Sequence, residues 1–250
     1  MTTKKPKKIT GIQELGDCSF SFQYGCTCNC VYCWAHKMAK RFNRVPAAGW
    51  DHPQLKPYIK IHDLPHDKSV VCFGTHDIDE TNVNEAIHWI WILINRGNHI
   101  IIVSKPRLKC IQQLIEEFMD LPRDRLEFIF TIGSQDDGTL KMWERNTTGF
   151  SERMECTGWT LCNNFKTSVL CEPLLDELIL SCNLIERLLE LKVSTMGRDS
   201  PDGQLTAVWI GAMKYIHNAP LLNYTLIYNR YKDNPRIKFK ESFRKHLGIK

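Results

Sequence analysis

Residues 24–34 read Tyr-Gly-Cys-Thr-Cys-Asn-Cys-Val-Tyr-Cys-Trp, a stretch that crowds four cysteines into one short loop. Cys26, Cys30 and Cys33 have the spacing CxxxCxxC, and Cys28 is an additional thiol inside it. Cysteine thiolates are the ligands of iron–sulfur clusters, and one short loop can wrap a cubane. Three ligands leave one iron of such a cubane open.

Zinc is the competing interpretation of this loop, since four neighbouring cysteines can in principle form a tetrahedral site. Zinc sites usually pair two separated knuckles, however, and no second CxxC follows downstream. A motif of this kind is also judged by its structural context, and here the loop follows a predicted strand of an α/β pattern. We therefore favour a four-iron, four-sulfur cluster over zinc.

Working outward from the loop, short apolar runs alternate with helical patterns. Continuous apolar strands are typical of a parallel sheet buried on both faces. Six units of one strand and one helix, joined by right-handed crossovers, predict an open, partial (β/α)6 barrel of the α/β class. The strands are expected at 17–24, 69–73, 100–104, 126–134, 166–172 and 206–211, with helices at 82–96, 108–118, 151–163 and 176–191.

Polar residues gather where these expected strands end, which is the edge at which such folds place their chemistry. Five strand ends share this feature, although isolated residues of these types are also ordinary in turns and caps. The residues are 25–33, Thr75 to Asp77, Ser104 with Lys105, Ser134 to Asp137, and Glu172.

The 250 residues and 43% hydrophobic content suit one sizeable core, with a flexible basic lead at 1–11, a barrel at 12–215 and a basic C-terminal extension at 216–250. Eleven cysteines without a secretion signal argue against a disulfide framework. The longest apolar runs are shorter than the roughly 20 residues that span a bilayer. We expect a cytoplasmic protein with no membrane partner.

The net charge of +5 is concentrated at the ends of the chain. Four lysines precede residue 12, and residues 230–250 carry eight basic and two acidic side chains. Aromatic residues are interleaved with the second group, namely Tyr224, Tyr228, Tyr231, Phe239 and Phe243. This pattern fits a polyanion such as nucleic acid, and it equally fits a solvated, charged surface.

The cysteine loop and its context resemble the radical S-adenosylmethionine (SAM) superfamily, whose motif has an aromatic residue, here Tyr32, before the last cysteine. The sequence looks most like the branch of spore photoproduct lyase and DNA repair photolyase-related proteins. The matching segments run in order through residues 17–215: YGCTCNCVYCWAHK at 24–37, GTHDI at 74–78, IVSKP at 102–106, TIGSQDD at 131–137, TSVLCEPLLD at 167–176 and VWIGAM at 208–213.

The resemblance implies a 4Fe-4S cluster on Cys26, Cys30 and Cys33, with SAM chelating the open iron. An electron from a flavodoxin or ferredoxin would break SAM to methionine and a 5′-deoxyadenosyl radical, which abstracts a substrate hydrogen. In such enzymes the cofactor carries the hard chemistry while the protein orients it.

The resemblance also gives individual residues expected roles around SAM. Thr75 would lie near the methionyl group, Lys105 would pair with its carboxylate, and Ser134 would bind the ribose or carboxylate. Tyr32 and Trp34 would contact adenine or serve only as packing aromatics. Glu172 is a further SAM-site candidate, whereas His76 and Asp77 would orient the loop or meet substrate.

The chain departs from spore photoproduct lyases at their cysteine hydrogen donor, whose place is taken here by Gly74. Cys72 lies two residues earlier, and strand alternation places it on the same face as Gly74, so a donor role for Cys72 would require an altered register. Thymine-dimer repair therefore does not carry over, and no catalytic residue is assigned. Cys28 is also an addition to the family motif, and we expect it to be a bystander, because a fourth protein ligand would block SAM. Three functions stay open: a radical enzyme acting on nucleic acid or nucleotides, one acting on a peptide or protein, and a non-catalytic metal-binding module.

Overall fold

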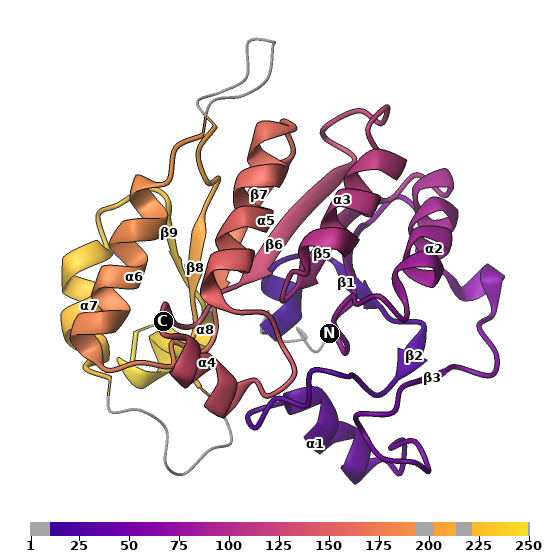
Figure 1. Ribbon diagram of the computed structural model, residues 1–250, viewed down its shortest axis with the longest axis horizontal. Helices are drawn as coiled ribbons and strands as arrows, with labels where there is room; N and C mark the ends of the chain where they lie inside the picture. The colour runs from indigo at the N-terminus through magenta and orange to yellow at the C-terminus, as the bar shows by residue number, and fades with distance from the viewer. Residues whose placement is uncertain (1–10, 194–202, 214–221, 250) are drawn as a thin grey trace, which may run out of the picture.

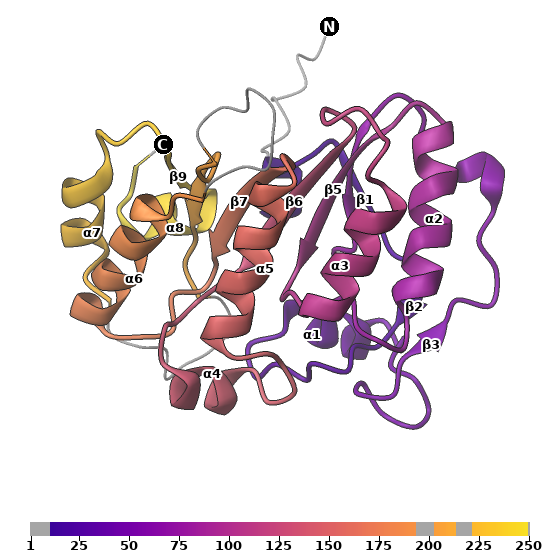
Figure 2. The ribbon, with the colours of Figure 1, turned by 45° about the horizontal axis from the view of Figure 1, so that its top comes forward.

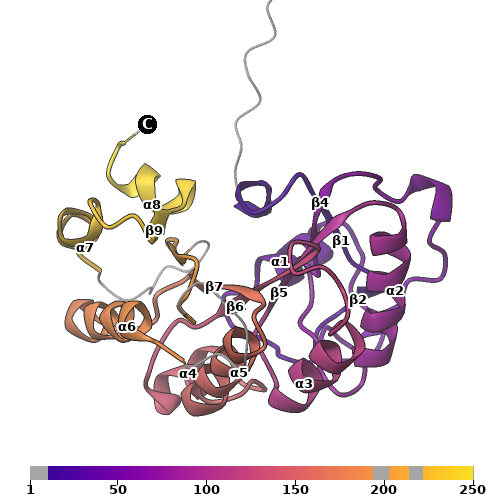
Figure 3. The same ribbon diagram turned by 90° about the horizontal axis from the view of Figure 1, so that it is seen from above.

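The computed structural model describes residues 11–193, 203–213 and 222–249. Its main sheet has seven strands in the order β1-β4-β5-β6-β7-β8-β9, and every neighbouring pair is parallel. The sheet curls without closing, as Figure 1 and Figure 3 show. The strands are β1 (Cys18–Phe20), β4 (Ser69–Cys72), β5 (His99–Ser104), β6 (Leu126–Thr131), β7 (Lys166–Cys171), β8 (Val208–Ile210) and β9 (Ile237–Phe239).

Helices cover the outer face of this sheet, as Figure 2 shows for α2, α3, α5 and α6. Their apolar stripes pack against the β-branched strands, and the resulting cores are fully buried. Their bounds are α2 (Val83–Asn95), α3 (Leu108–Glu117), α5 (Phe150–Cys162) and α6 (Leu178–Glu190). Shorter elements complete the fold: α1 (Trp34–Arg41), α4 (Asp137–Trp143), α7 (Tyr224–Tyr231), α8 (Glu241–His246) and the 3-10 turns η1 (Gly11–Glu14) and η2 (Ile61–Asp63).

The predicted first strand, 17–24, is split in two. After β1 the chain leaves the main sheet, and β2 (Gln23–Tyr24) pairs antiparallel with β3 (Gln54–Leu55). Gly25 follows at φ +88°, where a Cβ would lie 2.8 Å from the carbonyl oxygen of Trp50. The close approach of these two backbones turns the chain into the cysteine loop.

The other predicted strands and helices are confirmed with small shifts at their ends. The strands expected at 69–73, 126–134 and 166–172 end one to three residues early, at Cys72, Thr131 and Cys171. The polar residues that follow therefore lie in loops beyond the carboxyl edge of the sheet. None of the helices in the described ranges is long and apolar enough to cross a bilayer.

The C-terminal segment belongs to the sheet, because β9 adds a seventh parallel strand beside β8. Its interleaved aromatic rings pack on one another, with Tyr224 against Phe243 and Tyr228 against Phe239. Tyr231 and Phe243 are buried in the core that this segment shares with α6. The rings therefore contribute to packing: Tyr231 and Phe243 are buried, and Tyr224, Tyr228 and Phe239 are partly exposed. The leading lysines at 4–8 and Lys250 lie outside the described residues.

The turn η1 lies across the open side of the curled sheet, between β1 and α8 (Figure 3). Ile12 and Leu15, at and just after this turn, pack on the inner face of the sheet, against a cluster that includes Val71, Ile101, Ile129 and Leu170. The Glu14 carboxylate accepts a hydrogen bond from the backbone N–H of Glu241 at 2.7 Å. The first described residues therefore fill the barrel interior and fasten to its last helix.

Candidate active site

A cavity of about 750 Å³ opens at the carboxyl edge of the parallel strands. Its walls come from the cysteine loop, from the residues that follow five strands, and from η1. All of the predicted site residues except Ser134 line it: Cys26, Cys30, Tyr32, Cys33, Trp34, Thr75, Lys105 and Glu172. The cysteine loop and three strand ends thus converge as the strand-end rule predicts, whereas the fourth predicted strand end, Ser134 to Asp137, does not line the cavity.

Three of the four cysteines of the loop line this cavity. They are Cys26, Cys30 and Cys33, whereas Cys28 is 1% exposed and is not among the lining residues. Cys33 precedes α1, and its Sγ accepts a hydrogen bond from the backbone N–H of His36 at 3.3 Å. Burial raises the pKa of both Cys30 and Cys33, so binding of a metal would release their protons.

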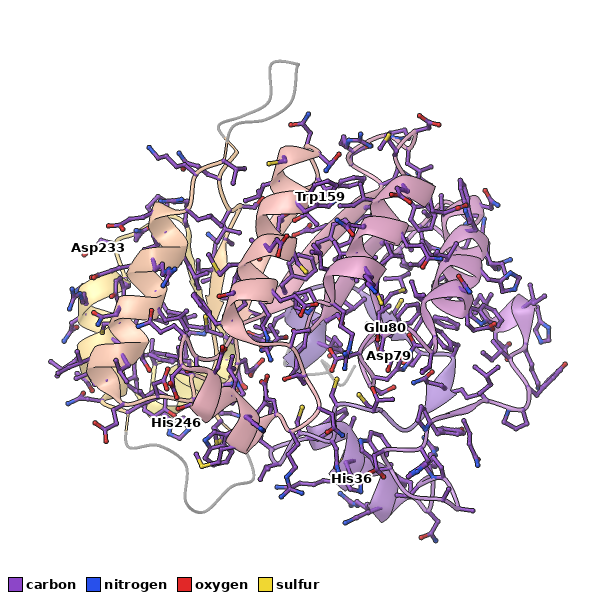
Figure 4. All side chains as sticks on the ribbon, in the orientation of Figure 1. His36, Asp79, Glu80, Trp159, Asp233 and His246 are labelled. Carbon is purple, nitrogen blue, oxygen red and sulfur yellow. The ribbon has the colours of Figure 1, made fainter. Side chains whose placement is uncertain are left out.

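Residues 143–146 clamp the cysteine loop from the side. The N–H of Val31 donates to the carbonyl of Trp143 at 2.9 Å, and the Asn146 side chain donates to the carbonyl of Thr27 at 3.0 Å. On the strand side, the Thr27 hydroxyl donates to the Asp79 carboxylate. Figure 4 labels Asp79 at the strand ends and His36 on α1, which lies below them in this view.

Behind this clamp lies a fully buried ion pair that the sequence analysis missed. Arg153 on α5 lies 2.6 Å from Glu144, and neither side chain is exposed. Glu144 also accepts a hydrogen bond from the hydroxyl of Tyr32, whose pKa burial raises well above its ordinary value. Tyr32 is therefore anchored at its tip, while its ring lines the cavity.

Asp77 links the cysteine loop to Lys105. Its carboxylate accepts from the N–H of Lys105 at 2.6 Å and lies 3.4 Å from the Lys105 ammonium. Burial alone would raise the pKa of Asp77, but the charge and N–H of Lys105 lower it further than burial raises it. Burial likewise opposes charge on Lys105, and chiefly Asp77 raises its pKa well above the ordinary value. Both groups are charged, so Lys105 has a counterion before any ligand arrives.

His76 is the least satisfied polar side chain of the cavity. It is 4% exposed, it stacks on Phe73 at an interplanar angle of 15°, and neither ring nitrogen has a partner among the described residues. Burial lowers its pKa to about 3, which keeps the ring neutral near pH 7. A neutral imidazole offers one donor and one acceptor to whatever occupies the cavity.

At the other end of the sheet, Glu172 meets Lys240. The Lys240 ammonium lies 2.7 Å from one carboxylate oxygen, and the Ser242 hydroxyl donates to the other at 2.7 Å. Lys240 and Glu172 both line the cavity. Lys240, which the sequence analysis counted among surface charges for a polyanion, is a buried member of the site.

Two predictions about side-chain position differ from the structure, one for Ser134 and one for Cys72. The Ser134 hydroxyl, fully buried, accepts from the N–H of Asp136 at 2.9 Å just before α4 and does not reach the cavity wall. Cys72 packs in the core beneath α2, while Gly74 lines the cavity, because β4 ends at Cys72 and strand alternation stops there. The expectation that Cys72 and Gly74 share a face is wrong.

No protein-family model matches the sequence, and neither does any curated protein. Two solved enzymes, both radical SAM enzymes, match the fold. One is a spore photoproduct lyase mutant with bound AdoMet and dinucleoside spore photoproduct, at a TM-score of 0.50 and 15% identity over 85% of this chain and 60% of that one. The other is SuiB of Streptococcus suis, at a TM-score of 0.51 and 8% identity over 89% of this chain and 48% of that one.

The chain has the radical SAM fold. A second structure of SuiB, bound to S-adenosylmethionine, matches equally, with a TM-score of 0.51. This chain spans 60% of the lyase and less than half of SuiB. At these identities the likeness establishes the architecture, and the chemistry has to be argued from the residues of this chain.

The donor set fits the cluster of the radical SAM fold. In a cubane each thiolate binds a different iron, so the sulfurs stand farther apart than around one ion. The compact donor group in the described part of the chain is instead Cys26, Cys28 and Asp77, whose ligand atoms lie within 4.8 Å of one another. Cys26, Cys30 and Cys33 form no such compact group, yet all three face one cavity.

Proposed function

We propose that this protein is a radical SAM enzyme whose cluster is held by Cys26, Cys30 and Cys33. The observation that carries the proposal is the division of the cysteine loop: these three cysteines line the cavity, and Cys28 does not. When bound, the cluster would supply the electron for reductive cleavage of SAM, which would yield a 5′-deoxyadenosyl radical able to take a hydrogen atom from the substrate.

The chain's own residues would bind, orient and shield these groups. Lys105, fixed by Asp77, offers a positive charge close to the cysteines, and Thr75 offers a hydroxyl on the neighbouring wall. Ile12 and Leu15 line the cavity from the inner face of the sheet, which limits water around the reacting atoms. Trp34, which follows the last proposed ligand, is 48% exposed. The electron donor that we propose is a flavodoxin or ferredoxin.

The substrate class that we propose is a nucleic acid or nucleotide. The spore photoproduct lyase with the same fold holds a dinucleoside, which supports this class without establishing it. A peptide or protein substrate is the alternative. Incubating the cluster-loaded protein and SAM with either class, and following hydrogen transfer into 5′-deoxyadenosine, distinguishes the two.

Single replacements test the ligand set. Cys26→Ala, Cys30→Ala and Cys33→Ala should each abolish the absorption near 400 nm of the anaerobically reconstituted protein and its production of 5′-deoxyadenosine, because each removes one of three iron ligands. Cys28→Ala is the matched control and should retain both. Loss of the cluster in Cys28→Ala with retention in Cys30→Ala would overturn the assignment.

A metal-binding module without catalysis is the second candidate, and the compact group of Cys26, Cys28 and Asp77 favours it. Three such ligands suit one zinc ion. Elemental analysis of the purified chain separates the two functions. Iron and sulfide in near-equal amounts support the enzyme, whereas zinc that is lost in Cys28→Ala supports the module.

A further inference from the structure

The Glu172–Lys240 pair stands at the opposite end of the strand order from the cysteines. The loop lies between β1 and β4, which begin the sheet, whereas Glu172 follows β7 and Lys240 follows β9, which ends it. Both side chains nevertheless line the same cavity as the three thiols. A ligand bound at the pair would therefore contact a different part of the cavity wall from the cysteine loop.

The structure holds the Glu172 carboxylate tightly. The Lys240 ammonium lies 2.7 Å from one carboxylate oxygen, and the Ser242 hydroxyl donates a hydrogen bond to the other at 2.7 Å. Ser242 in turn accepts from the N–H of Ala212 at 3.2 Å. At Gly211 a Cβ would lie 2.5 Å from the Glu172 carboxyl carbon, so the Glu172 side chain packs directly on this backbone in the space that a larger residue would fill.

Lys240 is held less completely than its partner. Its side chain is 3% exposed, and an ammonium carries three hydrogen-bond donors. Among the described residues, Glu172 is the charged acceptor that faces it. A buried N–H donor that has no hydrogen-bond acceptor costs free energy. Because Lys240 lines the cavity, a ligand in the cavity can provide that acceptor.

The cationic side chains of the cavity are lysines. In the described part of the chain the lining contains Lys105 and Lys240, each beside a carboxylate, and no arginine. Lysine commonly binds phosphate as a point charge. Tyr32, Trp34 and Phe73 line the same cavity, which gives a base aromatic surfaces to contact.

We propose that Lys240, paired with the Glu172 carboxylate that Ser242 fixes, binds a phosphate group of the substrate. This inference rests on the proposed radical SAM function and names the part of the substrate that this region of the cavity recognises. Phosphate occurs both in free nucleotides and in the nucleic acid backbone, and the experiment separates these sources.

Calorimetry with inorganic pyrophosphate tests the site in the full-length chain. The double variant Lys240→Met with Glu172→Gln removes both charges together, so neither is left buried without a partner. We expect it to bind pyrophosphate at least tenfold more weakly than the parent. Lys238→Met, which removes an exposed lysine from the same strand, should bind within twofold of the parent.

Equal binding by the double variant and the parent would overturn the proposal, as would no binding by the parent at millimolar pyrophosphate. If the double variant does not fold, a crystal structure of the parent with pyrophosphate decides: density beside Lys240 supports the site, and density only elsewhere refutes it. The titrations are run with and without the reconstituted cluster, so failure to load iron is seen separately from failure to bind the anion.

Two comparisons then identify the source of the phosphate. Tighter binding of AMP than of adenosine, lost in the double variant, indicates a nucleotide. Tighter binding of an eight-residue thymidine oligonucleotide than of AMP, again dependent on Lys240, indicates a nucleic acid. A peptide carboxylate such as acetyl-glycyl-glycine that binds more tightly than pyrophosphate through Lys240 would refute the assignment to phosphate.

Discussion

At the scale of single residues, His76 shows how burial sets chemistry. The ring lies between Phe22 and Phe73, and neither nitrogen has a partner in the described ranges. Burial lowers its pKa to about 3; Asp77 and Asp79 oppose this shift and Lys56 adds to it. Between pH 3 and its ordinary value near 6.5 the unfolded chain binds a proton that the folded chain does not.

The folded state is therefore fully stabilised by neutral His76 above about pH 6.5, and it loses this contribution as the pH falls toward 3. His76→Phe keeps an aromatic ring at this position but has no group to protonate. Between pH 7 and pH 5 its unfolding free energy should fall by roughly 2 kcal/mol less than that of the parent. Urea denaturation of the metal-free chain at both pH values measures this difference. The exposed His88→Gln should behave like the parent, and equal pH dependence in His76→Phe would contradict the prediction.

At the scale of elements, the cysteine loop keeps its shape through the segment that joins α4 to α5. The loop has little regular structure of its own, and its contacts to residues 143–146 tie it to a helix pair. The Glu144–Arg153 pair anchors that segment, and Arg153 also donates to the carbonyls of Thr131 and Thr148. The position of Tyr32 therefore depends on a residue of α5.

Arg153→Met should lower the free energy of unfolding by about 3–5 kcal/mol, because it leaves the Glu144 carboxylate buried without its partner. Arg145→Met, at an exposed arginine eight residues earlier, should change it by less than about 0.5 kcal/mol. Denaturant unfolding measures both. Similar stabilities of the two variants would show that the buried pair does not anchor the clamp.

At the scale of the whole molecule, the last described residues complete the barrel. β9 extends the sheet, α7 and α8 bury Ile227 and Phe243 with α6, and Lys240 neutralises Glu172 in the cavity. Glu14 joins α8 to η1 across the open side. A chain without this segment would expose part of its core and leave Glu172 buried without its counterion.

We expect a chain that ends at Met213 to lose cooperative unfolding and to aggregate, because it exposes the apolar surface that α7, β9 and α8 now cover. Circular dichroism during heating and size-exclusion chromatography test this expectation. A truncated monomer with the unfolding midpoint of the parent would show that the segment is an independent extension.

The sequence alone determined the features that depend on local spacing. The cysteine motif is contained in one loop, so the ligand set that we propose follows from its spacing without knowledge of the fold. Continuous β-branched runs such as 100–104 indicate strands buried on both faces, and parallel strands place their ends at one edge. That rule brought Thr75, Lys105 and Glu172 to the cavity wall, where the structure has them.

Only the tertiary structure decided which charges are buried and paired. Lys238 and Lys240 look alike in the sequence, yet one is exposed and the other lies against Glu172. Glu144 and Tyr32 are 112 residues apart, and no local sequence pattern predicts their hydrogen bond. Such pairs depend on which strands become neighbours and where each strand ends, because a shift of one residue reverses the face that a side chain occupies.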